Sequence, residues 1–151
     1  MKLSPNFSRD EFTFTQHRNI DNSLPLGYET NAMATCQMLE RIRSLLSHLA
    51  GRPIQIFVSS GYRSPELNTA VGGSSTSDHM YANAADWTAP DFGTPFEVCT
   101  ALKTQTANLS IGQLIHEYGR WIHTSTRIPK KLMNTIITIS KAGIEVGIHS
   151  V

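Results

Sequence analysis

The spacing of apolar residues predicts a long helix early in the chain and a strand directly after it. Over residues 30–50, apolar side chains recur every three or four positions, as on the buried face of a helix. Gly51 and Pro53 follow this pattern and are residues that commonly end a helix. Residues 54–60 are rich in β-branched and aromatic side chains, which predicts a strand. The apolar face of the predicted helix consists of Cys36, Leu39, Ile42, Leu46 and Leu49.

Start signals predict several shorter helices. The segments SRDE at 8–11 and TPFE at 94–97 have the form of a capping box, in which the first and fourth residues each bond to the other's backbone. The second box should begin a helix that runs to about Thr106. Ser64, which precedes a proline, is a suitable N-cap for another helix. Residues 111–118 are predicted to form a further short helix.

Strands are predicted mainly in the second half of the chain. Residues 84–87 and 121–123 are candidates, and they precede a hairpin whose strands are 136–140 and 144–148. Because helices come first and strands follow, we expect an α+β fold with a small, mainly antiparallel sheet packed by helices. A chain of this length can bury a sizeable core by itself, so 1–151 is predicted to be a single domain.

The composition excludes several classes of protein. Lys and Arg number 13 and Asp and Glu number 12, so a formal net charge of +1 gives no basic excess for binding nucleic acid. Hydrophobic residues make up 40% of the chain and charged residues 17%, which argues against disorder. No apolar run approaches the roughly 18 residues of a membrane span, so no stable membrane association is expected. The cysteines Cys36 and Cys99 are expected to be buried free thiols, and Tyr62, Trp87 and Trp121 to pack in the core.

Residues that can carry chemistry are concentrated between positions 59 and 86. On one helix, His79 and Asp86 would lie about 10 Å apart along the axis, too far to share a metal ion. They can meet only if His79 lies in a turn and Asp86 on a strand beneath it, which the alanines before Asp86 would permit. His123, at a predicted strand end, can supply a third ligand. Spacing alone leaves open that these histidines are surface or hydrogen-bonded residues, and no H-E-x-x-H helix is present.

Several motifs in this region together resemble a known family. Residues 60–64 read SGYRS and are followed by Asn68, and residues 71–73 read VGG. Residues 77–86 contain the pattern S-x-H with an alanine and an aspartate downstream, and residues 121–123 read WIH. In this order the motifs resemble those of the zinc D-alanyl-D-alanine carboxypeptidases and phage peptidoglycan endopeptidases, especially the small phage-type branch. The resemblance implies the fold that these enzymes share with the zinc domain of hedgehog.

The resemblance extends over about residues 6–125 and implies roles for individual residues. A zinc ion would be held by His79, Asp86 and His123. Arg63 would face the substrate, where its guanidinium can hold a peptide carboxylate or the oxyanion that forms during attack; the alternative is an ordinary surface salt bridge. Asn68 and Ser77 match positions that bind substrate or support the site.

Two departures from the family pattern concern the turn after His79 and the general base. The family has a glycine three residues after this histidine, where this chain has Ala82; the change matters if the position requires a positive φ. Many relatives place an acid or a histidine shortly before the last ligand, but Arg120 and Trp121 stand there. Glu117 is therefore predicted to be the base, with His116 as the alternative.

The resemblance implies a zinc-dependent peptidase that cuts the stem peptide of peptidoglycan, either as a D,D-carboxypeptidase or as an L-alanyl-D-glutamate-type endopeptidase. The first residues lack an apolar stretch of signal-peptide length, so we expect a protein that is cytoplasmic at synthesis. It is expected to be a monomer. It would reach the cell wall after holin-type release, as a phage endolysin, or from a virion. Two alternatives stay open: a non-enzymatic phage structural or binding protein that keeps the fold, and a host enzyme that trims free muropeptides.

Overall fold

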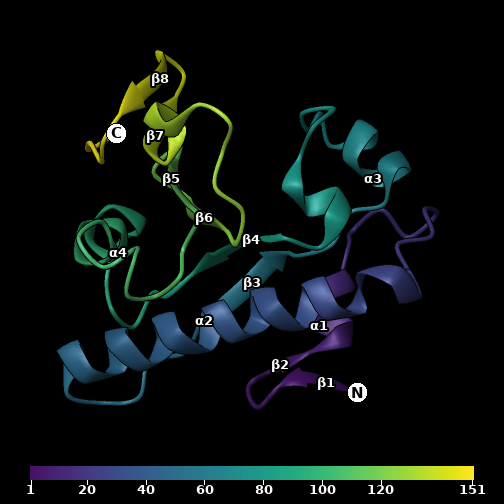
Figure 1. The fold of residues 1–151 in the computed structure, drawn as a ribbon, viewed down its shortest axis with the longest axis horizontal. Coiled ribbons are helices and arrows are strands. Elements are labelled where there is room, and N and C mark those ends of the chain that lie inside the picture. Colours follow the sequence, from purple (N-terminus) through teal and green to yellow (C-terminus); the bar gives the residue numbers. More distant parts are fainter.

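The computed structural model describes residues 1–151 and shows helices packed against a β-sheet (Figure 1). The helices are α1 (Arg9–Thr13), α2 (Glu29–Ala50), α3 (Pro65–Ala70) and α4 (Pro95–Leu102), with the short 3₁₀ helices η1 (Leu26–Tyr28), η2 (Asp78–Tyr81) and η3 (Leu132–Asn134). The strands are β1 (Lys2–Ser4), β2 (Phe7–Ser8), β3 (Phe57–Ser60), β4 (Ala84–Thr88), β5 (Gln113–Glu117), β6 (Trp121–Ser125), β7 (Ile136–Ser140) and β8 (Gly143–Val146).

The strands form two sheets of different size. β1 and β2 make a two-stranded sheet, and the other strands make a six-stranded sheet in the order β3-β4-β6-β5-β7-β8. Within the larger sheet every neighbouring pair is antiparallel except β5 and β7, which are parallel. The predicted α+β class with a mainly antiparallel sheet is confirmed, and so is the carboxyl-terminal hairpin, formed by β7 and β8.

The helix starts predicted from capping residues are confirmed, whereas two helix ends differ from expectation. Both capping boxes are present, Ser64 caps α3, and α2 ends at Gly51 in the left-handed conformation. Leu49, expected on the buried face of α2, is 54% exposed. The helix that begins at the second box ends at Leu102, earlier than the expected Thr106.

The prediction of a helix over residues 111–118 is wrong, because this segment contains β5. Leu114, Ile115 and His116 are all buried, so the strand lacks the alternation of apolar and polar residues that marks a half-exposed strand. A short apolar run of this kind does not distinguish a buried strand from a helix by its period. Pairing with β6 on one side and β7 on the other decides the conformation.

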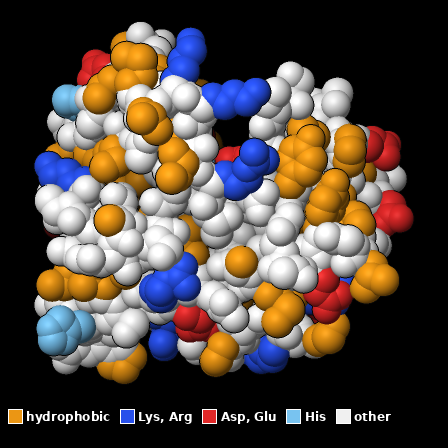
Figure 2. All heavy atoms as spheres, viewed as in Figure 1, with side chains coloured by type: hydrophobic (Ala, Val, Ile, Leu, Met, Phe, Trp, Pro, Cys, Tyr) orange, Lys and Arg blue, Asp and Glu red, His pale blue; other side chains and the backbone are white.

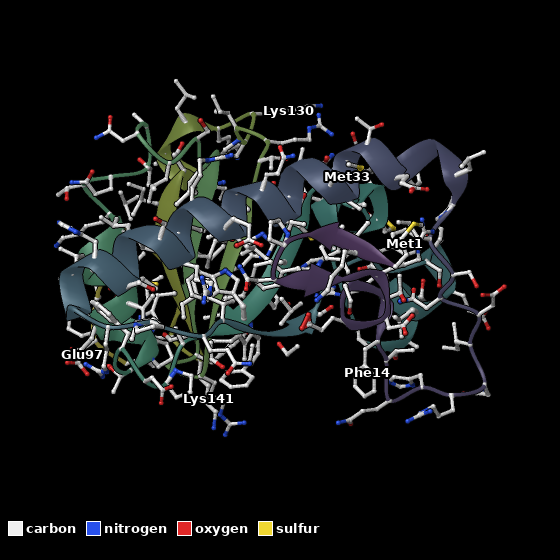
Figure 3. All side chains as sticks on the ribbon, turned by 90° about the horizontal axis from the view of Figure 1, so that it is seen from below. Met1, Phe14, Met33, Glu97, Lys130 and Lys141 are labelled. Carbon is white, nitrogen blue, oxygen red and sulfur yellow. The ribbon has the colours of Figure 1, made fainter.

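Alternation along β4 and β6 gives the larger sheet two different faces. Trp87 and Ile122 are fully buried in the hydrophobic core, which also includes most of the buried residues of α2. Helix α2 runs across the strands in the view of Figure 3. Asp86 and His123, the neighbours of these core residues in sequence, point to the opposite face. The core thereby positions polar side chains on the other side of the sheet.

The structure also shows the state of the two cysteines. Cys36 and Cys99 are both buried and unbridged, as predicted. None of the helices combines the length and the apolar character that crossing a membrane requires. On the face shown in Figure 2, Lys and Arg side chains are scattered among acidic and apolar groups, in keeping with a net charge of +1.

Candidate metal centre

His79, Asp86 and His123 meet on the face of the sheet opposite the core. Their ligand atoms all lie within 4.8 Å of one another, although the residues come from η2, β4 and β6. Asp86 Oδ1 lies 3.2 Å from Nε2 of His79 and 2.9 Å from Nδ1 of His123. All three side chains are buried, with exposed fractions of 2%, 6% and 8% in sequence order. The structure thus brings together the three residues that the motifs indicate as ligands.

Strand register and a tight turn produce this arrangement. Asp86 and His123 are directly paired across β4 and β6, which places both side chains on the same face. His79 lies on η2, the turn just before β4, as the sequence argument requires. Ser77 starts this turn, because its hydroxyl accepts a hydrogen bond of 3.2 Å from the His79 backbone N–H. Ala84 and Ala85 are fully buried, which agrees with the close packing expected there.

Ala82 ends the turn in the left-handed conformation, with φ of 61°. This explains why the resembled family has glycine at the position, since glycine adopts positive φ at no steric cost. Alanine adopts the same conformation here, where it is fully buried. Its carbonyl accepts a hydrogen bond of 2.7 Å from Thr35 of α2. Contacts with the core therefore hold the turn in place without the glycine.

The backbone near Gly61 orients the imidazole of His79. The carbonyl oxygen of Gly61 lies 2.6 Å from Nδ1 of His79, so Nδ1 carries the proton and Nε2 is free to bind a metal. A side chain at Gly61 would collide with Phe12, since a Cβ there would lie 2.5 Å from the Phe12 ring. Glycine is therefore required for the loop to approach α1 while its carbonyl reaches His79. Gly61 lies within the SGYRS motif, but its role depends on a contact with α1 that the motif alone does not indicate.

The three side chains fit a tetrahedral zinc ion. Ligand atoms that lie about 2 Å from a tetrahedral zinc are separated from one another by roughly 3.3 Å. The two distances from Asp86 Oδ1 are close to this value. Two histidines and a carboxylate are also a common ligand set of catalytic zinc, and three protein ligands leave a fourth position open.

The protonation states suit metal binding as well. Burial by itself raises the pKa of Asp86, but His79 and His123 outweigh it and hold the pKa well below its usual range, so the carboxylate stays charged. Burial lowers the pKa of His79, which favours the neutral imidazole. For His123 burial also lowers the pKa, but the hydrogen bond and charge of Asp86 outweigh it, and the pKa is raised. A cation in the site would replace the proton on His123.

Arg63 lies against a metal ligand and is not an ordinary surface salt bridge. Its guanidinium donates hydrogen bonds of 3.1 Å to Ser60 Oγ, to Asn68 Oδ1 and to Asp86 Oδ2. Its side chain is 14% exposed. Because Oδ2 of Asp86 is bonded to Arg63, Oδ1 is the oxygen that faces the two histidines. Arg63 therefore orients Asp86, in addition to any contact with substrate.

Asn68 and Gly73 fix the position of Arg63. Asn68 is buried, and both polar atoms of its side chain are bonded: Oδ1 accepts from Arg63 and Nδ2 donates to the Ser74 carbonyl at 2.8 Å. A Cβ at Gly73 would collide with Asn68 Oδ1 and would lie 2.8 Å from Nη1 of Arg63. The SGYRS, Asn68 and VGG motifs thus form one unit that supports Asp86. Substrate contact by Asn68 or Ser77 stays a prediction.

Arg63→Lys is expected to weaken zinc binding about 10- to 100-fold, the usual effect of removing a partner of a metal ligand. Lysine keeps the charge but cannot bond to Ser60, Asn68 and Asp86 at once. Zinc affinity can be measured by competition with a chromophoric chelator. Arg18→Lys, at an exposed position, serves as the control. Equal zinc affinity of the Arg63→Lys and wild-type proteins would show that Arg63 does not orient Asp86.

Glu117 lies on the same face of the sheet as the metal ligands. Its Oε1 atom is 3.9 Å from Nδ1 of His123, and its side chain is 18% exposed. Burial, together with the charge of Asp86, raises the pKa of Glu117 to about 7. A carboxyl group with such a pKa can both accept and donate a proton near neutral pH.

His116, the alternative base, points to the opposite face of the sheet. It pairs with Ile122 of the core, and its ring lies 5.9 Å from Phe96 of α4. Nδ1 of His116 lies 2.9 Å from the carbonyl oxygen of His149. The strand thus separates His116 from Asp86 and His123, and Glu117 is the group of the two that the structure places beside the ligands.

The raised pKa of Glu117 predicts a pH-dependent contribution to the stability of the metal-free protein. Between pH 4.5 and about 7 the folded state binds more protons at Glu117 than the unfolded state does, so stability falls as pH rises through this range. Glu117→Gln has no such titration. Urea unfolding of both metal-free proteins should show that the wild type loses on the order of 1–3 kcal/mol relative to Glu117→Gln across this range. A constant difference would show that the pKa is not raised.

Comparison with known proteins identifies the family. A family model described as peptidase M15 matches residues 5–125, about four-fifths of the chain. The match includes all the motifs around the three ligands and ends before β7 and β8. No curated protein matches the chain significantly. The chain therefore belongs to the peptidase M15 family, whose members are zinc enzymes, and it is a zinc metallopeptidase.

Proposed function

We propose that this zinc peptidase hydrolyses a peptide bond in the stem peptide of peptidoglycan. The family acts on cell-wall peptide, and its match covers the whole site. The observation that carries the proposal is the position of Glu117, a buried carboxyl group with a pKa of about 7 beside the His-Asp-His group. A purely structural metal site has no need for such a group, whereas peptide hydrolysis needs a base near the metal's open position.

In the proposed reaction each residue of the site has a distinct task. Zinc, when bound by His79, Asp86 and His123, supplies a Lewis acid that polarises a carbonyl oxygen and lowers the pKa of water. Glu117 accepts a proton from the attacking water on its carboxylate and donates it to the nitrogen of the leaving amine.

Arg63 is proposed to contribute to the same reaction. A guanidinium carries five N–H groups, and three of those of Arg63 donate to Ser60, Asn68 and Asp86, which leaves two. These two can stabilise the negative charge that develops on the carbonyl oxygen during attack.

The setting proposed for the enzyme is that of a phage endolysin or a virion-associated hydrolase that acts as a monomer. This part of the proposal rests on the similarity of the motifs to those of the small phage-type branch. The enzyme would be present in the cytoplasm after synthesis and would reach the cell wall after release by a holin or from a virion.

A zymogram on purified peptidoglycan, run beside an assay on free muropeptides, tests the proposal. Clearing of the gel by the wild-type protein, but not by a zinc-depleted sample, is the expected result. Cleavage of free muropeptides without clearing would instead indicate an enzyme that trims small peptides in the cytoplasm. Zinc-loaded protein that cuts neither substrate would contradict a role in peptidoglycan hydrolysis.

A further inference from the structure

A cavity of about 460 Å³ lies at the end of the sheet where β5 turns into β6. One wall comes from this turn and includes Tyr118, Arg120 and Trp121. The other wall comes from the turn between β7 and β8 and includes Ser140 and Lys141. In Figure 3, Lys141 lies on the opposite side of the molecule from Lys130, which precedes β7.

The cavity is lined by two cationic side chains, together with Ala142 and Val151. Arg120 and Lys141 are both exposed, and neither forms a salt bridge in the structure. Most of the other lining is apolar or aromatic: the rings of Tyr118 and Trp121 lie 5.7 Å apart at a tilt of 50°. Unpaired cations next to aromatic walls suit an anionic ligand that also carries apolar groups.

The backbone of Tyr118 is held in a conformation that a tyrosine seldom adopts. Its φ is 56°, in the left-handed region, and Gly119 follows with φ of 67°. The turn is tied to β7, because the Tyr118 N–H donates a hydrogen bond of 2.8 Å to the Ile139 carbonyl. Left-handed conformations of bulky residues are costly and tend to occur at functional sites. Here the strained residue supplies one wall of the cavity.

Trp121 connects the cavity to the catalytic face. It lines the cavity, and it is paired across the strands with Glu117. It also lies two positions before His123 on β6, so its side chain is on the same face as this ligand. Its indole N–H is buried and helps to stabilise the charged form of Glu117. A ligand in the cavity would therefore lie beside the residues that the proposed reaction uses.

We propose that this cavity is a subsite in which Arg120 and Lys141 bind a carboxylate of the peptide substrate. The inference rests on the proposed function, since the peptide that occupies the subsite is the one cut at the metal centre. Stem peptides carry free carboxylates near their scissile bonds, and the cavity is large enough for an amino-acid residue with its carboxylate. Lys141 belongs to the β7–β8 turn, which lies beyond the residues that the family model matches, whereas Arg120 lies within them.

Tryptophan fluorescence provides a direct binding assay. The chain has two tryptophans, of which Trp87 is fully buried in the core and Trp121 lines the cavity. The protein used is zinc-loaded Glu117→Gln, in which the peptide is expected to remain intact. The probes are two soluble stem peptides, one with every carboxylate free and one with every carboxylate converted to its amide. The free-acid peptide is expected to bind about three- to tenfold more tightly, as contacts with exposed cations typically allow.

Variants of the two cations decide whether the preference arises in this cavity. In the background of Glu117→Gln, adding Arg120→Gln and Lys141→Gln should abolish the preference for the free-acid peptide. Both positions are exposed, so these changes are expected to leave the melting temperature unchanged. Lys103→Gln, which removes an exposed cation at the end of α4, should keep the preference.

The outcomes separate this inference from the proposed function. Absence of a preference, including failure of either peptide to bind, would overturn the subsite, as would a preference that survives the loss of both cations. Clearing of peptidoglycan by the wild-type protein would in that case still support the proposed function. If the wild-type protein does not cut peptidoglycan, the proposed function fails regardless of how the peptides bind.

Discussion

Glu117→Gln is expected to slow hydrolysis of the stem peptide at least about 100-fold, the usual effect of removing an acid–base group. Glutamine has nearly the same shape as glutamate but cannot accept the proton of the attacking water. Glu117 is not among the three ligands, so zinc content and folding should stay close to those of the wild type. The turnover of a soluble stem peptide and the zinc content by elemental analysis, measured on the same preparation, check both parts.

A matched variant controls for the general effect of removing a carboxylate. Glu66 is exposed at the start of α3, so Glu66→Gln should leave turnover unchanged. Wild-type turnover by the Glu117→Gln protein would contradict the role of Glu117, and His116 would not replace it because its side chain lies on the other face.

Removal of a metal ligand is expected to have the second large effect. His79→Ala takes away one of three ligands and should lower both zinc content and activity to the background of the assay. The melting temperature should fall as well, because an ion that binds only the folded state stabilises it by about 4 kcal/mol at 1,000 times its Kd. Asp86→Ala and His123→Ala should behave in the same way. Thermal unfolding with and without a chelator measures this effect.

Adding a chelator shows whether the lower melting temperature of the variant results from the loss of bound zinc. It should lower the melting temperature of the wild type but leave that of His79→Ala unchanged, since the variant has no bound ion to lose. His48→Ala, at an exposed position on α2, should respond to the chelator as the wild type does. Normal zinc content in all three ligand variants would show that the metal is bound elsewhere.

Local signals in the sequence predicted much of the fold. Capping boxes depend on side chains three positions apart, so Ser8 and Thr94 marked helix starts without knowledge of the rest of the chain. Residues 111–118 were wrongly predicted because the conformation of β5 depends on its pairing with β6 and β7. The residues of β5 themselves carry no local signal of this pairing.

In the candidate site, too, the motifs predicted which residues are involved but not all the contacts between them. The motifs indicated the three residues that the structure brings together, and they placed Glu117 near His123. They could not indicate that Arg63 bonds to Asp86, because this contact joins residues 23 positions apart through the orientation of two side chains. The cavity beside Trp121 was equally unpredictable, since it forms between two turns that meet only in the folded sheet.

Mass spectrometry of purified peptidoglycan after digestion tests the central claim most directly, namely that this chain is a zinc peptidase that cuts the stem peptide. The account predicts that zinc-loaded wild-type protein releases muropeptides shortened or opened at one particular peptide bond. The Glu117→Gln protein should yield at least about 100-fold less of the same product in the same time. Peptidoglycan whose peptide bonds all remain intact after treatment with zinc-loaded wild-type protein would contradict the account.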